Sequence, residues 1–104
     1  MTAQWTPGFA WQGFEGIIHG GIVSTVLDEA MAKAAAVFAR KAVTAEMTVR
    51  FRLPVQPGQE LAIRGWVVEL TRRRIRTEAS IADDEGREFA HASATFLPAK
   101  EPSK

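Results

Sequence analysis

The spacing of apolar residues changes along the chain from a helical period to a period of two. Between Gly20 and about Arg40, apolar residues recur every three to four positions in two adjacent rows. These rows contain Ile22, Val26, Ala30 and Ala34, and Val23, Leu27, Met31, Ala35 and Phe38. Arg40 and Lys41 follow, where positive charge suits the negative end of a helix dipole. The pattern predicts one long helix that is covered on several sides.

After residue 42 the apolar residues alternate with polar ones, as in half-buried β-strands. In residues 43–51 one face would hold Val43, Ala45, Met47, Val49 and Phe51, and the other Thr44, Glu46, Thr48 and Arg50. Pro54 and Pro57 end this strand, because proline cannot donate to a sheet. Further strands are predicted at 60–70, 72–82 and 87–97, with a hairpin turn at Gly86.

The order of these elements, one long helix and then an antiparallel meander, predicts an α+β fold with the sheet wrapped around the helix. Residues 1–19 are expected to form a short strand and an irregular loop, and residues 98–104 a polar tail. The chain has 104 residues and neither a repeat nor a linker, so one domain over 1–104 is predicted. A domain of this size has a modest stability margin, which oligomerisation would increase.

Composition and charge narrow the possible functions. The chain has no cysteine, which excludes disulfides, thiolate catalysis and cysteine-ligated zinc. A net charge of +1 argues against nucleic acid or an anionic membrane surface as a partner. The sequence contains neither an apolar run of membrane-spanning length nor a signal-peptide pattern at its start. We therefore expect a cytoplasmic protein with no membrane or nucleic-acid partner.

Residues that could take part in catalysis or binding lie at and near the start of the predicted helix. A helix N-terminus presents free N–H groups and partial positive charge, and glycines there let a ligand approach the backbone. Gly20 and Gly21 therefore suit a carbonyl that becomes an oxyanion on attack. Asp28 lies almost in line with Gly21, two turns further along, with no cationic helical neighbour. We interpret Asp28 as a base or nucleophile; Glu29 is expected to pair with Lys33 on a solvated face.

These interpretations have alternatives. Asp28 could instead be a polar residue at a subunit interface or beside the loop before the helix. His19 could be a general base, a metal ligand or a structural group at the helix start. A metal site is not expected, because the chain has no cysteine and only His91 as a second histidine. His91 stands between small residues of the last strand and is interpreted as structural or surface.

Three segments resemble the hotdog-fold acyl-CoA thioesterases of the phenylacetate-degradation type. They are WQGFEGIIHGGIVSTVLDEAMAKAA, TAEMTVRFRLPVQPGQELAIRGWVV and RRRIRTEASIADDEGREFAHASATFLP, nearly the whole chain from Gln12. The most specific feature is His-Gly-Gly with an aspartate nine residues after the histidine, and the Pro-x-x-Pro-Gly loop strengthens it. The N-terminal segment is shorter than in usual members. The resemblance implies hydrolysis of acyl-CoA or aryl-CoA without a cofactor, coenzyme A being part of the substrate. It also implies a homo-oligomer, a dimer or a tetramer built as a dimer of dimers.

The resemblance also assigns roles to single residues. It makes Asp28 the catalytic carboxylate, gives the oxyanion hole to the Gly20 N–H and lets His19 orient the carbonyl. A Ser or Thr at the position of Thr44 holds the attacking water from the neighbouring subunit. Some relatives carry Asn or Gln six residues before the histidine; this sequence has Gly13 there and Gln12 just before it. Gln12 and Gly21 are therefore candidates for binding substrate.

A cluster of arginines completes the list of candidates. Arg72, Arg73, Arg74 and Arg76 fall within five positions, and strand alternation would set Arg73 on the opposite face from the others. The cluster is either a charged edge strand that discourages aggregation or a binding site for the phosphates of coenzyme A. In relatives a basic residue near Arg73 contacts the nucleotide end of coenzyme A.

Alternatives to a thioesterase remain. One is a non-catalytic acyl-CoA-binding or regulatory module; a hotdog dehydratase or hydratase would need an Asp/His pair at short spacing, which we do not find. The acyl group is undetermined. Aromatic residues of the N-terminal segment could line its pocket, although they more often pack: Trp5, Phe9, Trp11 and Phe14.

Overall fold

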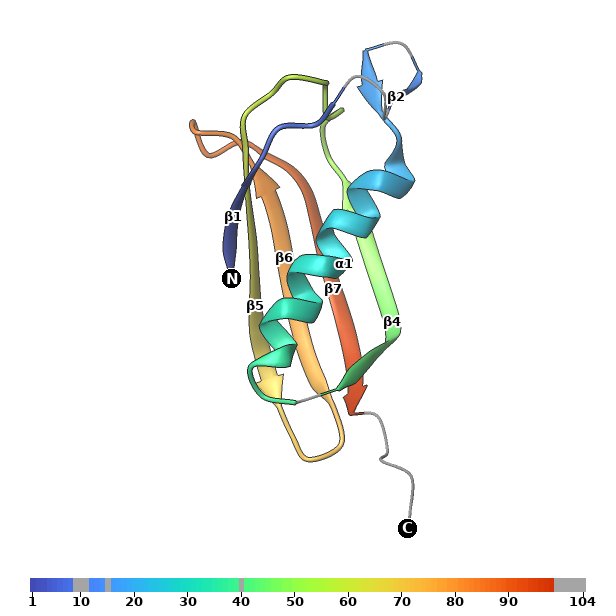
Figure 1. Ribbon diagram of the computed structural model, residues 1–104, viewed down its shortest axis with the longest axis vertical. Coiled ribbons are helices and arrows are strands. Elements are labelled where there is room, and N and C mark those ends of the chain that lie inside the picture. The colour runs from blue at the N-terminus through green and yellow to red at the C-terminus, as the bar shows by residue number, and fades with distance from the viewer. Residues whose placement is uncertain (9–11, 15, 40, 99–104) are drawn as a thin grey trace.

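The computed structural model describes residues 1–8, 12–14, 16–39 and 41–98. These contain one helix, α1 (Gly20–Ala36), which lies across one face of a five-stranded antiparallel sheet (Figure 1). The sheet has the order β1-β5-β6-β7-β4, with β1 (Thr2–Trp5), β5 (Leu61–Leu70), β6 (Ile75–Ala82), β7 (Glu88–Pro98) and β4 (Ala42–Phe51). β2 (Gln12–Phe14) and β3 (Ile17–Ile18) pair with each other just before the helix. The predicted α+β class is confirmed.

The helix begins where the sequence predicts but ends earlier. Apart from Phe38, both predicted apolar rows pack into the core, and Leu27, Met31 and Ala35 are completely buried. Beyond Ala36, the N–H groups of Phe38 and Ala39 both donate to the Ala35 carbonyl, at 2.9 and 3.1 Å, in a tightened final turn. Val37 and Phe38 are 79% and 55% exposed, so tertiary packing does not stabilise a longer helix here. The predicted extension to about Arg40 is therefore wrong; Lys41 follows the helix, and Arg40 itself lies outside the described residues.

A row of small residues lets the helix lie close to the sheet. Gly65, Ala79, Ala92 and Val49 are direct partners across β5, β6, β7 and β4. Ala79 and Ala92 are buried beneath the helix. A Cβ added at Gly65 would lie 2.5 Å from the backbone oxygen of Ala30. The backbone of α1 therefore sits directly on Gly65.

This contact makes Gly65 the most size-restricted glycine of the described residues. Gly65→Ala is expected to destabilise the fold by about 1–3 kcal/mol, because neither helix nor strand backbone can yield without moving its neighbours. Urea unfolding followed by circular dichroism measures the loss. Gly58→Ala is the comparison variant. Gly58 has open space around it but a φ of 83°, so this substitution tests backbone strain without a steric clash. A Gly65→Ala variant as stable as the wild type would contradict the close packing.

An irregularity in β4 changes which face Thr44 presents. Met47 pairs with Ala94 and Thr44 pairs with Phe96, two successive buried positions of β7, so Ala45 is an extra residue in β4. Thr44 therefore lies on the helix side of the sheet together with Met47 and Val49. The alternation had placed Thr44 on the opposite face from Met47, which is wrong because a β-bulge shifts the register by one residue.

The turn predicted at residues 83–86 is confirmed. The Gly86 N–H donates to the Asp83 carbonyl at 3.1 Å, and Gly86 has a φ of 82°. No helix among the described residues is long and apolar enough to cross a membrane.

Candidate active site

The first turn of α1 leaves one backbone donor free. The His19 carbonyl accepts from the N–H groups of Ile22 and Val23, at 3.0 and 3.2 Å. The His19 side chain caps the helix, because its Nδ1 accepts from the Gly21 N–H at 2.8 Å. The Gly20 N–H has no hydrogen-bond partner among the described residues. Of the two glycines predicted to meet a substrate, Gly20 therefore has an available N–H, whereas that of Gly21 is occupied by the cap.

The cap also determines the tautomer of the neutral His19 ring. Because Nδ1 accepts a hydrogen bond, the proton of the neutral imidazole is assigned to Nε2. His19 is exposed, so its Nε2–H can donate to a group that binds beside the helix end. Of the three roles left open for His19, the structural group at the helix start is the one observed. The cap also leaves the His19 Nε2–H able to donate to a carbonyl, which is the orienting role that was predicted.

An apolar cavity of about 430 Å³ opens beside the free Gly20 N–H. It is lined by Ile17, Ile18, His19, Gly20, Val23, Phe51, Arg52, Leu53, Pro54 and Val55. Phe51, Arg52 and Leu53 were not predicted from the sequence, although their place at the end of the strand just before Pro54 was a usable signal. Of the aromatic residues suggested for an acyl pocket, Trp5 is the one whose side chain is described, and it does not line this cavity. Trp5 packs against the core; Phe9 and Trp11 lie outside the described residues, as does the Phe14 side chain.

Asp28 and Thr44, sixteen residues apart, form a hydrogen-bonded pair between α1 and β4. The Thr44 hydroxyl donates to Asp28 Oδ1 at 2.9 Å. Asp28 is half-buried and has no ion-pair partner among the described residues, whereas Thr44 is exposed along the open edge of the sheet. Glu29 is exposed as predicted, but its expected ion pair with Lys33 is not formed. Both side chains stand in solvent, where such a pair contributes little.

The two halves of the predicted site lie apart within one chain. Gly20 and Asp28 are eight residues apart in the helix, which is about 12 Å along its axis. The free N–H groups of a first turn point out of the helix N-terminus, and therefore away from Asp28. A carbonyl bound to the Gly20 N–H would lie beyond the N-terminus, further still from that carboxylate.

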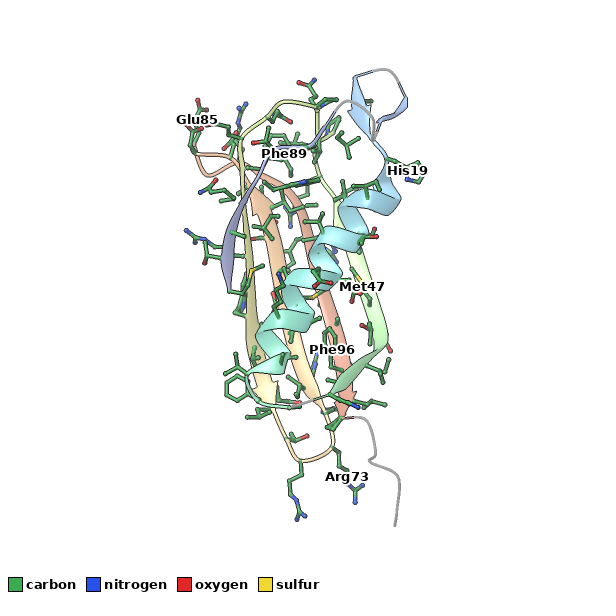
Figure 2. All side chains as sticks on the ribbon, in the orientation of Figure 1. His19, Met47, Arg73, Glu85, Phe89 and Phe96 are labelled. Carbon is green, nitrogen blue, oxygen red and sulfur yellow. The ribbon has the colours of Figure 1, made fainter. Side chains whose placement is uncertain are left out.

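The arginine cluster forms a hairpin rather than a strand. β6 begins at Ile75, so Arg72, Arg73 and Arg74 lie in the turn from β5 and only Arg76 is in a strand. The Thr71 hydroxyl accepts from the N–H groups of Arg73 and Arg74, at 3.3 and 3.1 Å, which makes the local turn more favourable than extended pairing. The predicted alternation of these arginines between two faces is therefore wrong. Figure 2 shows Arg73 and His19 at opposite ends of the molecule.

Gln12 is the remaining predicted site residue. Its backbone pairs with Ile18 in the β2-β3 hairpin, next to the start of α1. Its side chain lies outside the described part of the structure. No group of three or more His, Asp or Glu residues in the described ranges is placed to hold a metal ion.

His91 takes part in a charged cluster on the face of the sheet away from α1. Its Nε2 lies 2.8 Å from Glu78 Oε1 and its Nδ1 lies 3.2 Å from Glu88 Oε2. Burial lowers the pKa of His91, but the hydrogen bonds and charges of the two glutamates outweigh it and raise the pKa above its ordinary value. Glu88 also pairs with Arg52, at 3.1 Å. This cluster is separate from Asp28 and makes His91 the structural residue that was predicted.

The cluster predicts a pH dependence of stability. Because the pKa of His91 is raised in the folded state, protonation of His91 stabilises the fold. This stabilisation is complete below the ordinary histidine pKa of about 6.5 and is lost as the pH rises through the pKa of the folded state. The stability difference between wild type and His91→Gln is therefore expected to be larger at pH 6 than at pH 9. Urea midpoints of both proteins across this range measure it. A difference that stays constant, or grows with pH, would contradict an imidazolium held between two carboxylates.

Comparison with known proteins relates this geometry to one group. A model of the thioesterase superfamily matches residues 15–90 of the chain. Acyl-coenzyme A thioesterase THEM4 of Xenopus laevis is 26% identical over 98 residues, which are 93% of this chain and 44% of that protein. The chain thus spans less than half the length of this relative.

Solved structures share the arrangement of helix and sheet. The BH2602 protein of Bacillus halodurans, solved with CoA, has a TM-score of 0.80 and 26% identity, covering 90% of this chain and 68% of that one. A phenylacetic acid degradation-related protein of Ralstonia eutropha JMP134 has a TM-score of 0.84 and 21% identity, covering 92% and 74%. The hotdog fold expected from the sequence is confirmed.

Proposed function

Because the chain belongs to the thioesterase superfamily, we propose that it hydrolyses acyl-CoA or aryl-CoA thioesters to the free acid and CoA. The observation that carries this proposal is the free Gly20 N–H at a helix N-terminus, beside an apolar cavity of about 430 Å³. A thioester carbonyl accepting from Gly20 is polarised, and the helix end stabilises the oxyanion formed on attack. The acyl group then enters the cavity, and the His19 Nε2–H helps to orient the carbonyl.

Asp28 supplies the second half of the reaction. Its carboxylate takes a proton from water as the water oxygen bonds to the carbonyl carbon, or it attacks that carbon itself. The C–S bond then breaks. In the first route the proton taken from water passes to the thiolate of CoA. In the second route a mixed anhydride on Asp28 forms as the thiolate leaves, and water then hydrolyses this anhydride, which releases the acid, restores the carboxylate and supplies the proton to the thiolate. Thr44 donates to one carboxylate oxygen, which fixes the direction of the other. The reaction needs no cofactor, since CoA is part of the substrate.

The working site is proposed to combine two copies of the chain. The separation of about 12 Å and the outward direction of the Gly20 N–H keep Asp28 from reaching a carbonyl on its own helix. The Asp28–Thr44 pair, by contrast, opens at the unpaired edge strand β4, where a second copy can pair. A two-fold pairing of β4 edges runs the two helices in opposite directions. A homodimer, or a tetramer of two such dimers, would then set Gly20 of one copy against Asp28 of the other.

The remaining candidates are proposed to hold CoA. Arg72 and Arg73 are exposed in the hairpin turn, and Arg74 pairs with Glu69 at 3.1 Å. Guanidinium groups suit the phosphates of CoA. CoA is the ligand with which the similar BH2602 protein was solved. The distance of this turn from His19 in one chain means that it would serve the site of a neighbouring copy. Gln12, next to the helix start, and the Gly21 backbone would line the thioester end.

A thioester panel assayed by release of free thiol tests the proposal directly. Acetyl-, hexanoyl-, palmitoyl-, benzoyl- and phenylacetyl-CoA cover the size range, and turnover of at least one is expected. Size-exclusion chromatography with light scattering in the same buffer determines the oligomeric state; full activity in a monomer would overturn the shared site. If the protein binds acyl-CoA but cleaves no thioester, the alternative of a non-catalytic acyl-CoA-binding module replaces the enzyme.

A further inference from the structure

Phe51 is a large aromatic residue in a place where the core does not need it. It is the last residue of β4 and lies on the helix side of the sheet, opposite Ala90. Its side chain is 57% exposed although it lines the cavity at the helix N-terminus. Burial therefore accounts for only part of its surface, and the exposed part includes atoms that line the cavity.

The ring of Phe51 stands directly beside Gly20. A Cβ built on Gly20 would lie 3.5 and 3.6 Å from Cζ and Cε1 of Phe51, which is ordinary van der Waals contact. Outside the chain neighbours and the helix's own backbone, the ring edge is thus the protein surface nearest to the position of a Gly20 Cβ. Gly20 and Phe51 both line the cavity, so a group that enters it from a carbonyl at Gly20 meets a wall that includes this ring.

We infer that Phe51 is a specificity-determining residue, which limits branching of the acyl group at the carbon next to the carbonyl. This inference rests on the proposed thioester hydrolysis at Gly20. A straight chain leaves the carbonyl as a narrow methylene and can pass the ring edge. An acyl group branched at that carbon carries a second substituent, which meets the ring. Such contacts change selectivity by factors of about 10–200 for a single carbon.

The other residues of the cavity wall do not explain selectivity for the acyl group at the carbon next to the carbonyl. Arg52 is the charged residue of the cavity wall, and it is held by Glu88 at 3.1 Å. Leu53, Pro54 and Val55 also line the cavity, and the Val55 carbonyl accepts from the Ile18 N–H at 2.7 Å. Apart from His19, which is assigned to the carbonyl oxygen, Phe51 is the described lining residue whose side chain is in contact distance of a Gly20 Cβ.

The matched substrates are butyryl-CoA and isobutyryl-CoA, which have the same atoms and differ only in branching next to the carbonyl. Phe51→Ala is expected to raise the isobutyryl-to-butyryl ratio of kcat/KM by about tenfold. Phe51→Trp is expected to lower the same ratio, which keeps the test decisive if the alanine variant folds poorly. Val43→Ala is the control: it lies at the other end of β4, is 56% exposed and does not line the cavity. An unchanged ratio in both Phe51 variants, or an equal change in Val43→Ala, would overturn the inference.

A binding experiment separates this inference from the proposed function. The ketones S-(2-oxopentyl)-CoA and S-(3-methyl-2-oxobutyl)-CoA keep a carbonyl with the same branching beside it and cannot be hydrolysed, because a methylene separates the carbonyl from sulfur. Calorimetric titration with them therefore reports selectivity without turnover. A shift in their affinity ratio on Phe51→Ala supports the role of Phe51 even if no thioester is cleaved, in which case the proposed hydrolysis alone fails. Equal affinity ratios in wild type, Phe51→Ala and Phe51→Trp refute the role of Phe51 even if hydrolysis is observed.

Discussion

Replacement of Asp28 by Asn is expected to lower kcat by about 10²–10⁴-fold on every accepted thioester, the range that general bases contribute. Asparagine has the size of aspartate and keeps an Oδ1 that accepts from the Thr44 hydroxyl, so the contact of 2.9 Å between α1 and β4 survives. It cannot take a proton from water or attack a carbonyl. Stopped assays of free thiol at saturating substrate measure kcat for both proteins.

The Asp28→Asn variant is expected to bind acyl-CoA as tightly as the wild type, which isothermal titration determines. Thr44→Val serves as the paired variant, because it removes the donor to Asp28 at nearly constant volume. Its loss of kcat is expected to be smaller than that of Asp28→Asn, since the carboxylate remains and loses only one hydrogen bond. If Asp28→Asn retained wild-type turnover, Asp28 would instead be a polar residue between subunits.

Replacement of Gly20 by Pro is expected to lower kcat by about 10²–10³-fold, the loss found when one oxyanion-hole donor is removed. Proline has no N–H, and it is favoured at the first position of a helix, where the N–H has no intrahelical partner. The preceding residue, His19, has a ψ of 134°, which a following proline accepts. The substitution therefore deletes the free donor while the helix is retained, which circular dichroism verifies.

Gly20→Ala is the matched control for Gly20→Pro. Alanine keeps the N–H, and its Cβ would lie 3.5 Å from Phe51 without a clash. Activity near that of the wild type is expected for alanine and a large loss for proline. Equal losses in the two variants would show that the space beside Gly20, rather than its N–H, supports the reaction.

The same two defects test whether the site is shared between copies. Gly20→Pro and Asp28→Asn are each expected to keep about 1% or less of wild-type activity alone, but a refolded equal mixture is expected to recover about a quarter of it. This follows because half of the dimers pair the two variants and one of their two sites is intact. A mixture that stays inactive would indicate that Gly20 and Asp28 act within one chain.

The fold and the helix-start residues were accessible from the sequence because they depend on local rules. The helix of period 3.6, the strands of period two and the turn at Gly86 each follow from spacing and backbone preference. The position of Gly20 at the helix start follows in the same way. Asp28, on the same helix, could be singled out because it had no cationic neighbour, although its contact with Thr44 depends on tertiary structure.

The features that the sequence did not reveal depend on long-range pairing. The bulge at Ala45 is visible only when β4 is set against β7, because both registers leave apolar residues at alternate positions. The arginines were predicted to lie in a strand, because the hydrogen bonds from Arg73 and Arg74 to the Thr71 hydroxyl, which stabilise the turn, are not evident from residue spacing. The proposed role of Phe51 required the contact between a strand end and a helix start, Phe51 and Gly20, that are 31 residues apart in the chain.

The row of Gly65, Ala79, Ala92 and Val49 determines the height at which α1 crosses the sheet. An α-helix is stiff over its whole length, so a larger side chain beneath its middle tilts or lifts both ends together. Gly20 and the Asp28–Thr44 contact would then shift relative to β4 without any change in their own side chains. Mutations that reduce activity while sparing the site are therefore to be sought along this row, where tolerance to added methyl groups is lowest.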